Sequence, residues 1–318
     1  MAHQVQTMAY ANAEPWHGLG NRLQPNQPLE VWQQQAGMAW QINETPVLFN
    51  ISADGGLHVK AHTDNKVLFR SDTHAALSVV SKRYQVVQPH EVLEFYRDLT
   101  DAGGFELETA GVLKEGRKLW ALAKTGQETL LRGGDKVAAY LLLATSCDGT
   151  LCTTAQFTSI RVVCNNTLQM AVGDSSGAVK VPHSTKFDPQ LVKQELGIGL
   201  SSWERFVGNM KRLAERPIHK FEAMNLIVNV LGDPELPLAD QPNQKALQNV
   251  YALYSGGGMG AELSSANGTA WGLLNAVTQF VDHERRARSQ DTRLDSAWFG
   301  QGAAIKGKAY QEAMKLAA

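Results

Sequence analysis

The sequence predicts an α+β fold, in which an antiparallel, hairpin-rich sheet with packed helices is followed by a mainly helical C-terminal part. In the first half of the chain, short apolar runs alternate with turn residues, which is typical of strands joined as hairpins. From Asp188 onward, apolar residues recur at helical spacing instead. This change of period predicts a β-rich α+β domain over residues 1–187 and a helical domain over 188–318, with a proline-containing linker near 233–243.

The composition is that of a globular protein without a strong charge bias. The 318 residues are 43% hydrophobic and 19% charged, and the formal net charge is −1. This balance argues against a polyanion held by overall charge and leaves only a local basic patch for such a partner. No apolar run reaches the length of a membrane span, and the N-terminus lacks the pattern of a secretion signal. The three cysteines cannot all pair internally, so we expect a reducing cytoplasm.

The N-terminal elements follow from local patterns. Residues 28–37 predict a short helix with Leu29 and Trp32 on one side. Runs separated by turn residues then predict a meander, over residues 40–43, 47–51, 57–61, 67–70 and 76–80. Pro89 suits the first turn of a helix, which the apolar spacing extends over residues 90–99.

The central stretch, residues 105–157, predicts four consecutive antiparallel strands. Residues 137–144 are apolar throughout, as in a strand that is buried on both faces. The dipeptide Asp148-Gly149 is a strong hairpin signal, because glycine accepts the positive φ that tight hairpin turns require.

The segment after this hairpin fits two interpretations. After residue 158 or 159 the apolar residues fall at helical spacing, namely Ile160, Val163, Cys164, Leu168 and Ala171, and they predict a helix that includes residues 165–172. The alternative is a short strand over 160–164, followed by a helix that Asn165 or Asn166 caps. Residues 173–187 are expected to form a loop.

The C-terminal part predicts a series of helices. Asp188 and Pro189 are a helix start, with the acid at the N-cap and proline at the first position. Further helices are expected over residues 220–231 and 244–254. A last buried helix presents its apolar residues inward, namely Trp271, Leu274, Val277 and Val281. The charged run 282–288 at its end is expected to be a solvated helix terminus.

The cysteines suggest two kinds of chemistry. Cys164 with His183 could be a nucleophile and its base, oriented by Asn166 or Asp188, since a thiolate needs a neighbouring imidazole. A cysteine among valines is more often a small buried residue. Zinc on Cys147, Cys152, Cys164 and His183 is disfavoured, because no second close pair of ligands exists. No cofactor is therefore predicted.

Basic and polar side chains at the hairpins suggest a second kind of site. The candidate nucleic-acid-binding residues are Arg83, Tyr84, Lys114, Arg117, Lys118, Arg161, Asn165 and Asn166. Basic side chains bind phosphates, and Tyr84 or Trp120 could stack on a base. Ordinary charge at hairpin tips is the alternative explanation.

Several motifs are shared with a known family. They are residues 15–20 (PWHGLG), 109–111 (TAG), 140–149 (YLLLATSCDG), 160–168 (IRVVCNNTL) and 268–277 (GTAWGLLNAV). In these motifs the chain resembles the phage/plasmid-like proteins of the domain-of-unknown-function-932 family. The resemblance implies a mobile element in a bacterial cytoplasm and implies no particular reaction. A sheet of hairpins followed by a helix is also similar in outline to single-strand annealing recombinases.

Three hypotheses follow. The first is a protein that binds or anneals single-stranded DNA and works as a homo-oligomeric ring or filament. The second is a cysteine-dependent hydrolase that uses Cys164 and His183. The third is an oligomeric scaffold without chemistry.

Overall fold

The computed structural model describes residues 5–12, 20–53, 56–101, 103–163, 166–169, 178–196, 200–288 and 290–318. It confirms the α+β fold class. The chain forms two compact units that are interleaved in sequence. Unit 1 comprises residues 1–125, 141–156 and 178–198, and unit 2 comprises residues 126–140, 157–177 and 199–318.

The larger sheet has the strand order β10-β9-β8-β7-β6-β1-β2, and β11 also pairs with β9. The four expected consecutive strands are confirmed as neighbours: β6 (Glu106–Leu113), β7 (Lys118–Leu131), β8 (Asp135–Ser146) and β9 (Thr153–Arg161). At the other edge, β1 (Val5–Ala11) pairs antiparallel with β6 and parallel with β2 (Asn21–Leu23). Nearly all of β8 is buried, as its unbroken apolar run predicts.

The expected helix near 165–172 is wrong for its described residues. They form β10 (Asn166–Gln169), which runs antiparallel to the end of β9 with Asn166 opposite Arg161. The alternative, a helix capped by Asn165 or Asn166, is also wrong, because residues 166–169 form this strand. Apolar spacing over so few residues fits either element, and pairing with β9 decides for the strand. Part of the expected loop is also a strand, because β11 (Ala178–Val181) pairs with β9 as well.

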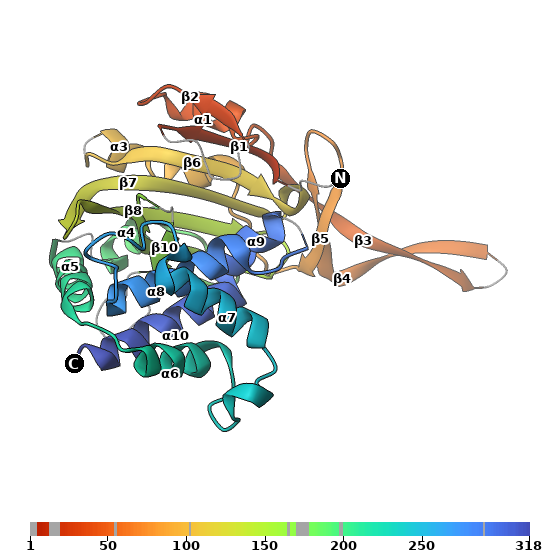
Figure 1. Ribbon diagram of the computed structural model, residues 1–318. Helices are drawn as coiled ribbons and strands as arrows, with labels where there is room; N and C mark the ends of the chain where they lie inside the picture. Colours follow the sequence, from red (N-terminus) through yellow and green to blue (C-terminus); the bar gives the residue numbers. More distant parts are fainter. Residues whose placement is uncertain are drawn as a thin grey trace. The chain divides into compact units, whose positions relative to one another are not determined.

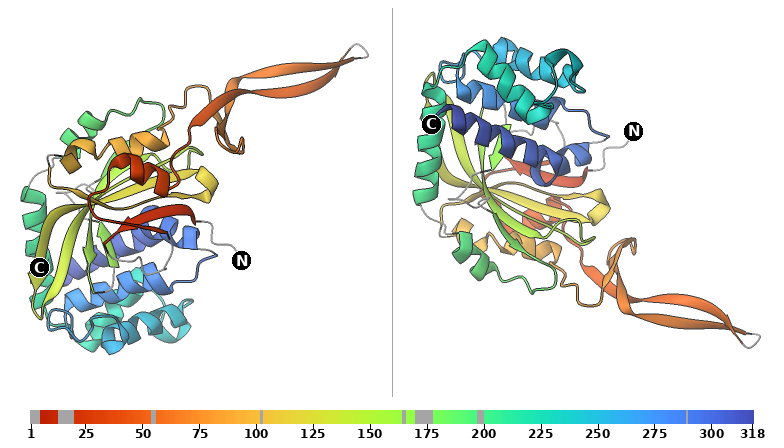
Figure 2. Two further views of the ribbon diagram at one scale, coloured as in Figure 1. Left: turned by 90° about the horizontal axis from the view of Figure 1, so that it is seen from above. Right: turned by 90° about the horizontal axis from the view of Figure 1, so that it is seen from below.

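A separate three-stranded sheet confirms the meander, with longer strands than expected. It has the order β3-β4-β5, with β3 at Ile42–Ala53, β4 at Gly56–Arg70 and β5 at Ala76–Ser81. Beyond a register shift at Pro46/Val47, β3 and β4 continue as a two-stranded ribbon, here called the arm (Figures 1 and 2). The arm carries large exposed apolar side chains, including Leu48, Leu57 and Val59.

The helices of unit 1 are short. Leu29 and Trp32 are buried on α1 (Leu29–Gln35), as predicted. The expected helix over 90–99 is two helices, α2 (Pro89–Glu94) and α3 (Arg97–Asp101), and Pro89 opens the first. Asp188 accepts backbone hydrogen bonds from Gln190 and Leu191 at 3.0 and 3.2 Å, which confirms it as the cap of α4 (Pro189–Leu196).

Unit 2 holds the longer helices. They are α5 (Leu200–Glu215), α6 (Lys220–Leu231), α7 (Gln244–Ala252), α8 (Ala270–Gln279), α9 (Gln290–Phe299) and α10 (Gln301–Leu316). The last helix, α10, contacts α5, α6, α8, α9 and β10 (Figure 1). Its buried residues, Gly302, Lys306, Ala309 and Ala313, follow a spacing of three and four. Small side chains on that face let the neighbouring helices approach. None of the described helices is long and apolar enough to cross a membrane.

Candidate anion-binding site

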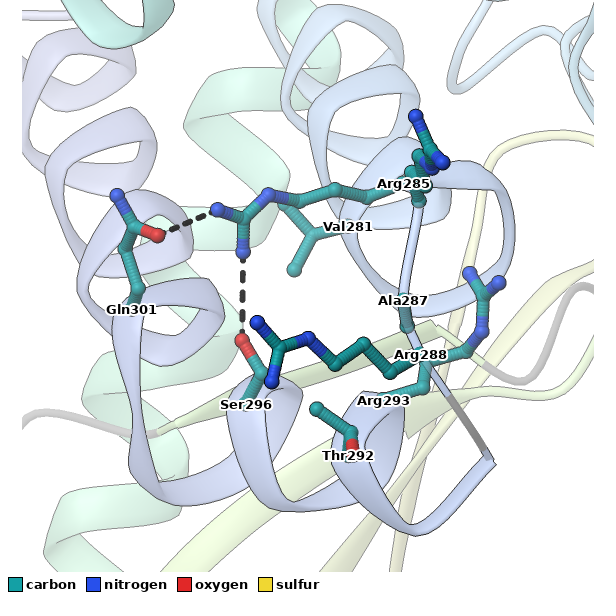
Figure 3. Close-up of a pocket in the computed structure, with 9 residues that line it drawn as sticks. Val281, Arg285, Ala287, Arg288, Thr292, Arg293, Ser296 and Gln301 are labelled. Atoms are coloured by element: carbon teal, nitrogen blue, oxygen red, sulfur yellow. Dashed lines mark hydrogen bonds between the residues drawn. The ribbon is translucent and has the colours of Figure 1, made fainter. Parts of the chain in front are cut away.

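Four arginines surround one cavity in unit 2, which we call the arginine pocket. Its volume is about 360 Å³, and its lining residues are Val281, Arg285, Arg286, Ala287, Arg288, Thr292, Arg293, Ser296 and Gln301 (Figure 3). None of these lining residues is acidic. The pocket is therefore a concentration of positive charge in a chain whose formal net charge is −1.

The local backbone explains why the arginines converge. A single π-helical turn, η4 (Phe280–Glu284), extends α8 and ends where Arg285 leaves the helical conformation. Arg285, Arg286 and Arg288 lie on the connection to α9, and Arg293 lies near the start of that helix. The connection between two helices and the start of the second thus supply four arginines, from nine positions of sequence, to the lining of one pocket.

The part of the pocket that α9 and α10 form depends on a close contact between these two helices. A Cβ at Gly302 would lie 2.8 Å from the Ser296 carbonyl oxygen and 2.9 Å from Val281 Cγ1. The Gly302 amide also donates to Ser296 Oγ at 3.2 Å. Glycine at this position therefore allows α10 to pack against α9 and η4.

The four guanidinium groups differ in their surroundings. Arg285 donates to Ser296 Oγ at 3.3 Å and to Gln301 Oε1 at 2.5 Å, so its group is held between α9 and α10 (Figure 3). Arg286 and Arg288 are exposed, whereas Arg293 is half-buried. Among the described residues, none of the four groups forms an ion pair.

Arg293 is the most unusual member of the pocket. Its Nε and Nη1 atoms are buried and have no hydrogen-bond partner in the described part of the chain. Burial lowers the pKa of this guanidinium from its ordinary value, although arginine stays protonated in proteins. Buried donor atoms without a hydrogen-bond partner are costly, so an anion that accepts from these two atoms would relieve that cost. Guanidinium donors match the oxygens of phosphate and carboxylate groups.

The charged run 282–288 is only partly the solvated helix end that the sequence predicts. Asp282 is buried and forms an ion pair of 2.7 Å with Lys306, which is also buried. Asp282 Oδ2 additionally accepts hydrogen bonds from the Thr167 amide and hydroxyl, at 2.8 and 3.0 Å. This network ties η4 to α10 and β10, and the expectation of a solvated terminus is wrong for Asp282.

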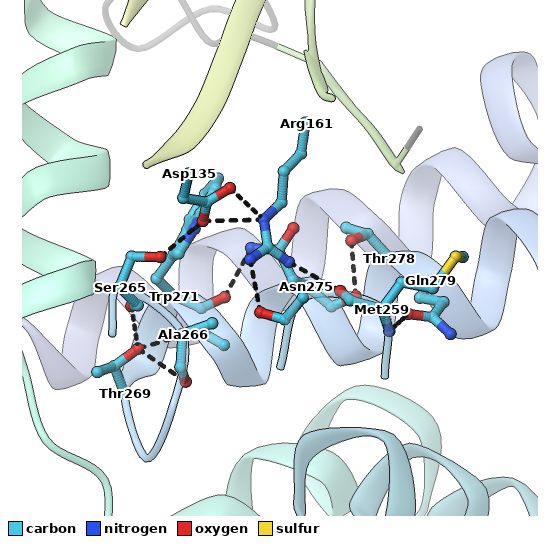
Figure 4. A network of polar contacts seen from close by, with 12 residues as sticks. Asp135, Arg161, Met259, Ser265, Ala266, Thr269, Trp271, Asn275, Thr278 and Gln279 are labelled. Atoms are coloured by element: carbon cyan, nitrogen blue, oxygen red, sulfur yellow. Dashed lines mark hydrogen bonds and ion pairs between the residues drawn. The ribbon is translucent and has the colours of Figure 1, made fainter. Parts of the chain in front are cut away.

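Arg161 lies in the interior and not at a surface for phosphates. Its Nε lies 2.8 and 2.9 Å from the two carboxylate oxygens of Asp135, and its Nη2 donates to the Gly260 carbonyl at 2.9 Å (Figure 4). Ser265 and Trp271 also donate to Asp135, at 2.7 and 3.0 Å. The side chains of Arg161 and Asp135 are 3% and 0% exposed. Arg161 therefore stabilises the fold of unit 2.

The other predicted nucleic-acid contacts are divided between surface and interior. Arg83 and Arg117 are exposed, Lys114 is half-buried, and Lys118 is buried. Tyr84 stacks on His183 with ring centroids 4.4 Å apart and donates to the Ser146 carbonyl at 2.8 Å. This stacking uses one face of the Tyr84 ring.

Other predictions fall where the structure describes less of the chain. Asn165 lies outside the described residues, and so do Cys164 and the 15–20 motif apart from Gly20. Asn166 belongs to β10, but the position of its side chain is not among the described features.

His183 is held by backbone groups. Its two ring nitrogens lie 3.1 Å from the Gln85 carbonyl oxygen and 2.9 Å from the Leu151 carbonyl oxygen. Both nitrogens therefore have structural partners, and the contacts of His183 do not support the role of a catalytic base.

The described cysteines do not form a metal site. Cys147 is buried, and burial raises the pKa of its thiol to about 12, whereas Cys152 is exposed. Within the described ranges, no three His, Cys, Asp or Glu residues are grouped to hold a metal ion.

Comparison with protein families shows to which family the chain belongs. A family model described as Domain of unknown function (DUF932) matches residues 76–298, which is more than two thirds of the sequence. The chain belongs to this family. The four arginines of the pocket lie inside the part that matches DUF932, and the arm lies before it. Searches of curated proteins and of solved structures found no match.

Sequence reasoning missed the pocket although its residues were visible. In the sequence, the run 282–288 fits a solvated helix terminus, and Arg293 lies outside that run. Four arginines within nine residues, 285–293, are the signal that could have indicated an anion site.

Proposed function

We propose that this DUF932 protein binds nucleic acid, with single-stranded DNA as its ligand, in the cytoplasm of a cell that carries a phage or plasmid. The observation that carries the proposal is the arginine pocket, where four arginines line one cavity and form no ion pair with any described residue. The phage or plasmid setting comes from the family resemblance alone.

Phosphate is the anion that such a pocket fits best. Arginine is over-represented where planar, bidentate recognition of phosphate is needed. Because the formal net charge is −1, binding of a polyanion must depend on a local site of this kind and not on the overall field.

The shape of the site favours a single strand over a duplex. A cavity of about 360 Å³ admits a phosphate with its attached sugar, but the rigid, convex backbone of a duplex cannot bend into it. A single strand is flexible and can present one phosphate at a time. The exposed Arg83 and Arg117 of unit 1 remain candidates for further phosphate contacts.

Fluorescence anisotropy of a labelled single-stranded oligonucleotide, titrated at several salt concentrations, tests the proposal. Arg286→Ala and Arg288→Ala should each weaken binding and lower the slope of log K against log salt by about 0.7, the value for one phosphate contact on a single strand. Arg205→Ala is the matched control, because Arg205 is an exposed arginine of unit 2 outside the pocket. Unchanged binding in both pocket variants would contradict the assignment.

A second candidate function, assembly without chemistry, is favoured by the arm. A two-stranded ribbon is only marginally stable in water, and Leu48, Leu57 and Val59 are 62%, 69% and 62% exposed. In the cross-strand register of the arm, Leu48 pairs with Ala61, Val59 pairs with Asn50, and Leu57 pairs with Ser52. Light scattering on the intact chain and on a Leu57→Thr/Val59→Thr variant tests this role. A mass that falls in the variant supports assembly, and two equal masses argue against it.

A further inference from the structure

We infer that the arginine pocket binds the terminal phosphate of a DNA strand, a phosphomonoester, in preference to an internal phosphodiester. The inference rests on the proposed function, because it specifies which part of the strand occupies the same site. Three features of the pocket carry it: its size, its four arginines, and two buried donors of Arg293 that have no partner among the described residues.

The first feature is the limited volume. A cavity of about 360 Å³ lies near the lower end of the range for small-ligand sites, and it has room for roughly one nucleotide. An internal phosphodiester carries a nucleotide on each side, so both neighbours must leave through the mouth of the cavity. A strand end carries a neighbour on one side only and can enter by itself.

The second feature is the concentration of positive charge. Proteins that follow a nucleic-acid backbone distribute basic residues along a groove, one phosphate after another. Here Arg285, Arg286, Arg288 and Arg293 lie within nine residues of sequence and line one cavity. A terminal phosphate carries a charge of about −1.5 to −2 and three strong acceptor oxygens at neutral pH. A diester carries one charge and two free oxygens, and so satisfies fewer of these donors.

The third feature is the state of the donors. Two donors of Arg285 are already engaged with Ser296 and Gln301, which holds that side chain in place. In contrast, Nε and Nη1 of Arg293 are buried without partners among the described residues. The pocket thus combines a prepositioned arginine with unsatisfied donors, and this arrangement suits a ligand with several acceptors in one group.

The test compares three oligonucleotides of one sequence, each labelled at an internal base. One carries a 5′-phosphate, one a 3′-phosphate, and one hydroxyl groups at both ends. We expect about tenfold tighter binding of at least one phosphorylated strand, since one further charge-assisted hydrogen bond is worth roughly a factor of ten or more. The preference should grow between about pH 5 and pH 7.5, because the second ionisation of a phosphomonoester has a pKa of about 6.

Variants locate the preference. Arg293→Gln and Arg288→Ala should abolish the difference between phosphorylated and hydroxyl ends, and Arg205→Ala should leave it intact. Circular dichroism of each variant tests whether it is folded. A preference that survives in both pocket variants would place the end-binding site elsewhere and overturn the inference.

The remaining outcomes separate this inference from the proposed function. If all three strands bind equally and the pocket variants weaken all of them alike, the protein binds DNA but does not select ends. If no strand binds at low salt, both proposals fail. Competition by deoxynucleoside monophosphate, without binding of any oligonucleotide, would identify the pocket as a site for free nucleotides and would also overturn the inference.

Discussion

Arg161→Ala is expected to make the protein unfold more readily and to leave the proposed DNA binding of its folded form unchanged. In the intact protein the guanidinium pairs with Asp135 and donates to the carbonyl groups of Met259 and Gly260. Without it, the fully buried Asp135 carboxylate keeps, among the described residues, the donors of Ser265 and Trp271.

The magnitude follows from the burial of the pair. Removing one partner of a buried ion pair costs about 3–5 kcal/mol, because the remaining charge is left uncompensated. For a domain of 150–250 residues, each kcal/mol lowers the melting temperature by about 2–4 °C, so the loss should be roughly 6–20 °C. Thermal unfolding followed by circular dichroism measures this shift.

A double variant shows whether the unpaired charge is the cause. Asp135→Leu combined with Arg161→Met leaves no charge at this buried site. This double variant should unfold at a higher temperature than Arg161→Ala. The reasoning is refuted if Arg161→Ala melts within about 2 °C of the intact protein. It is also refuted if the folded variant loses DNA binding, because Arg161 would then contact the ligand after all.

Three further expectations concern other sites. Arg293→Met should raise the melting temperature slightly, because it removes two buried donor atoms that have no hydrogen-bond partner among the described residues, and it should weaken the proposed DNA binding. A lower melting temperature would show that the cation stabilises the fold. Iodoacetamide at about pH 8 should label Cys152 and leave Cys147 unreacted in the folded protein, because burial raises the pKa of the Cys147 thiol to about 12. Peptide mass spectrometry measures the two labelling rates, and equal rates would contradict this expectation. The hydrogen bond from Arg70 lowers the pKa of Asp72 below its ordinary value of 3.8. The stability from this pair is therefore fully present above pH 3.8 and is lost as the pH falls through the lowered pKa. Asp72→Asn should flatten the acid side of a plot of melting temperature against pH, and an unchanged plot would argue against the coupling.

Much of the fold could be predicted because many elements depend on neighbours in sequence. The cap of α4 is a contact between the Asp188 side chain and amides two and three residues later. The start of α2 depends on Pro89, whose ring already has a helical φ. The helix over 220–231 was expected with the limits that α6 has. The hairpins of the central sheet likewise follow from alternating side chains and from turns of a few residues.

The candidate site could be predicted only in part. Four arginines between 285 and 293 are visible in the sequence, yet their chemistry depends on where the chain reverses. A straight continuation of α8 would have spread them around a helix. The turn at Arg285 and the approach of α10 at Gly302 bring them to one cavity instead.

The sequence by itself determined the α+β class, the hairpins, most helix starts and the relation to DUF932. Only the tertiary structure decided that residues 166–169 form a strand, that Arg161 is buried against Asp135, and that both nitrogens of His183 face backbone carbonyls. The physical reason is common to these cases. Burial and hydrogen-bond partners are set by residues far apart in the chain, such as Asp135 and Trp271, and local patterns carry no information about those distances.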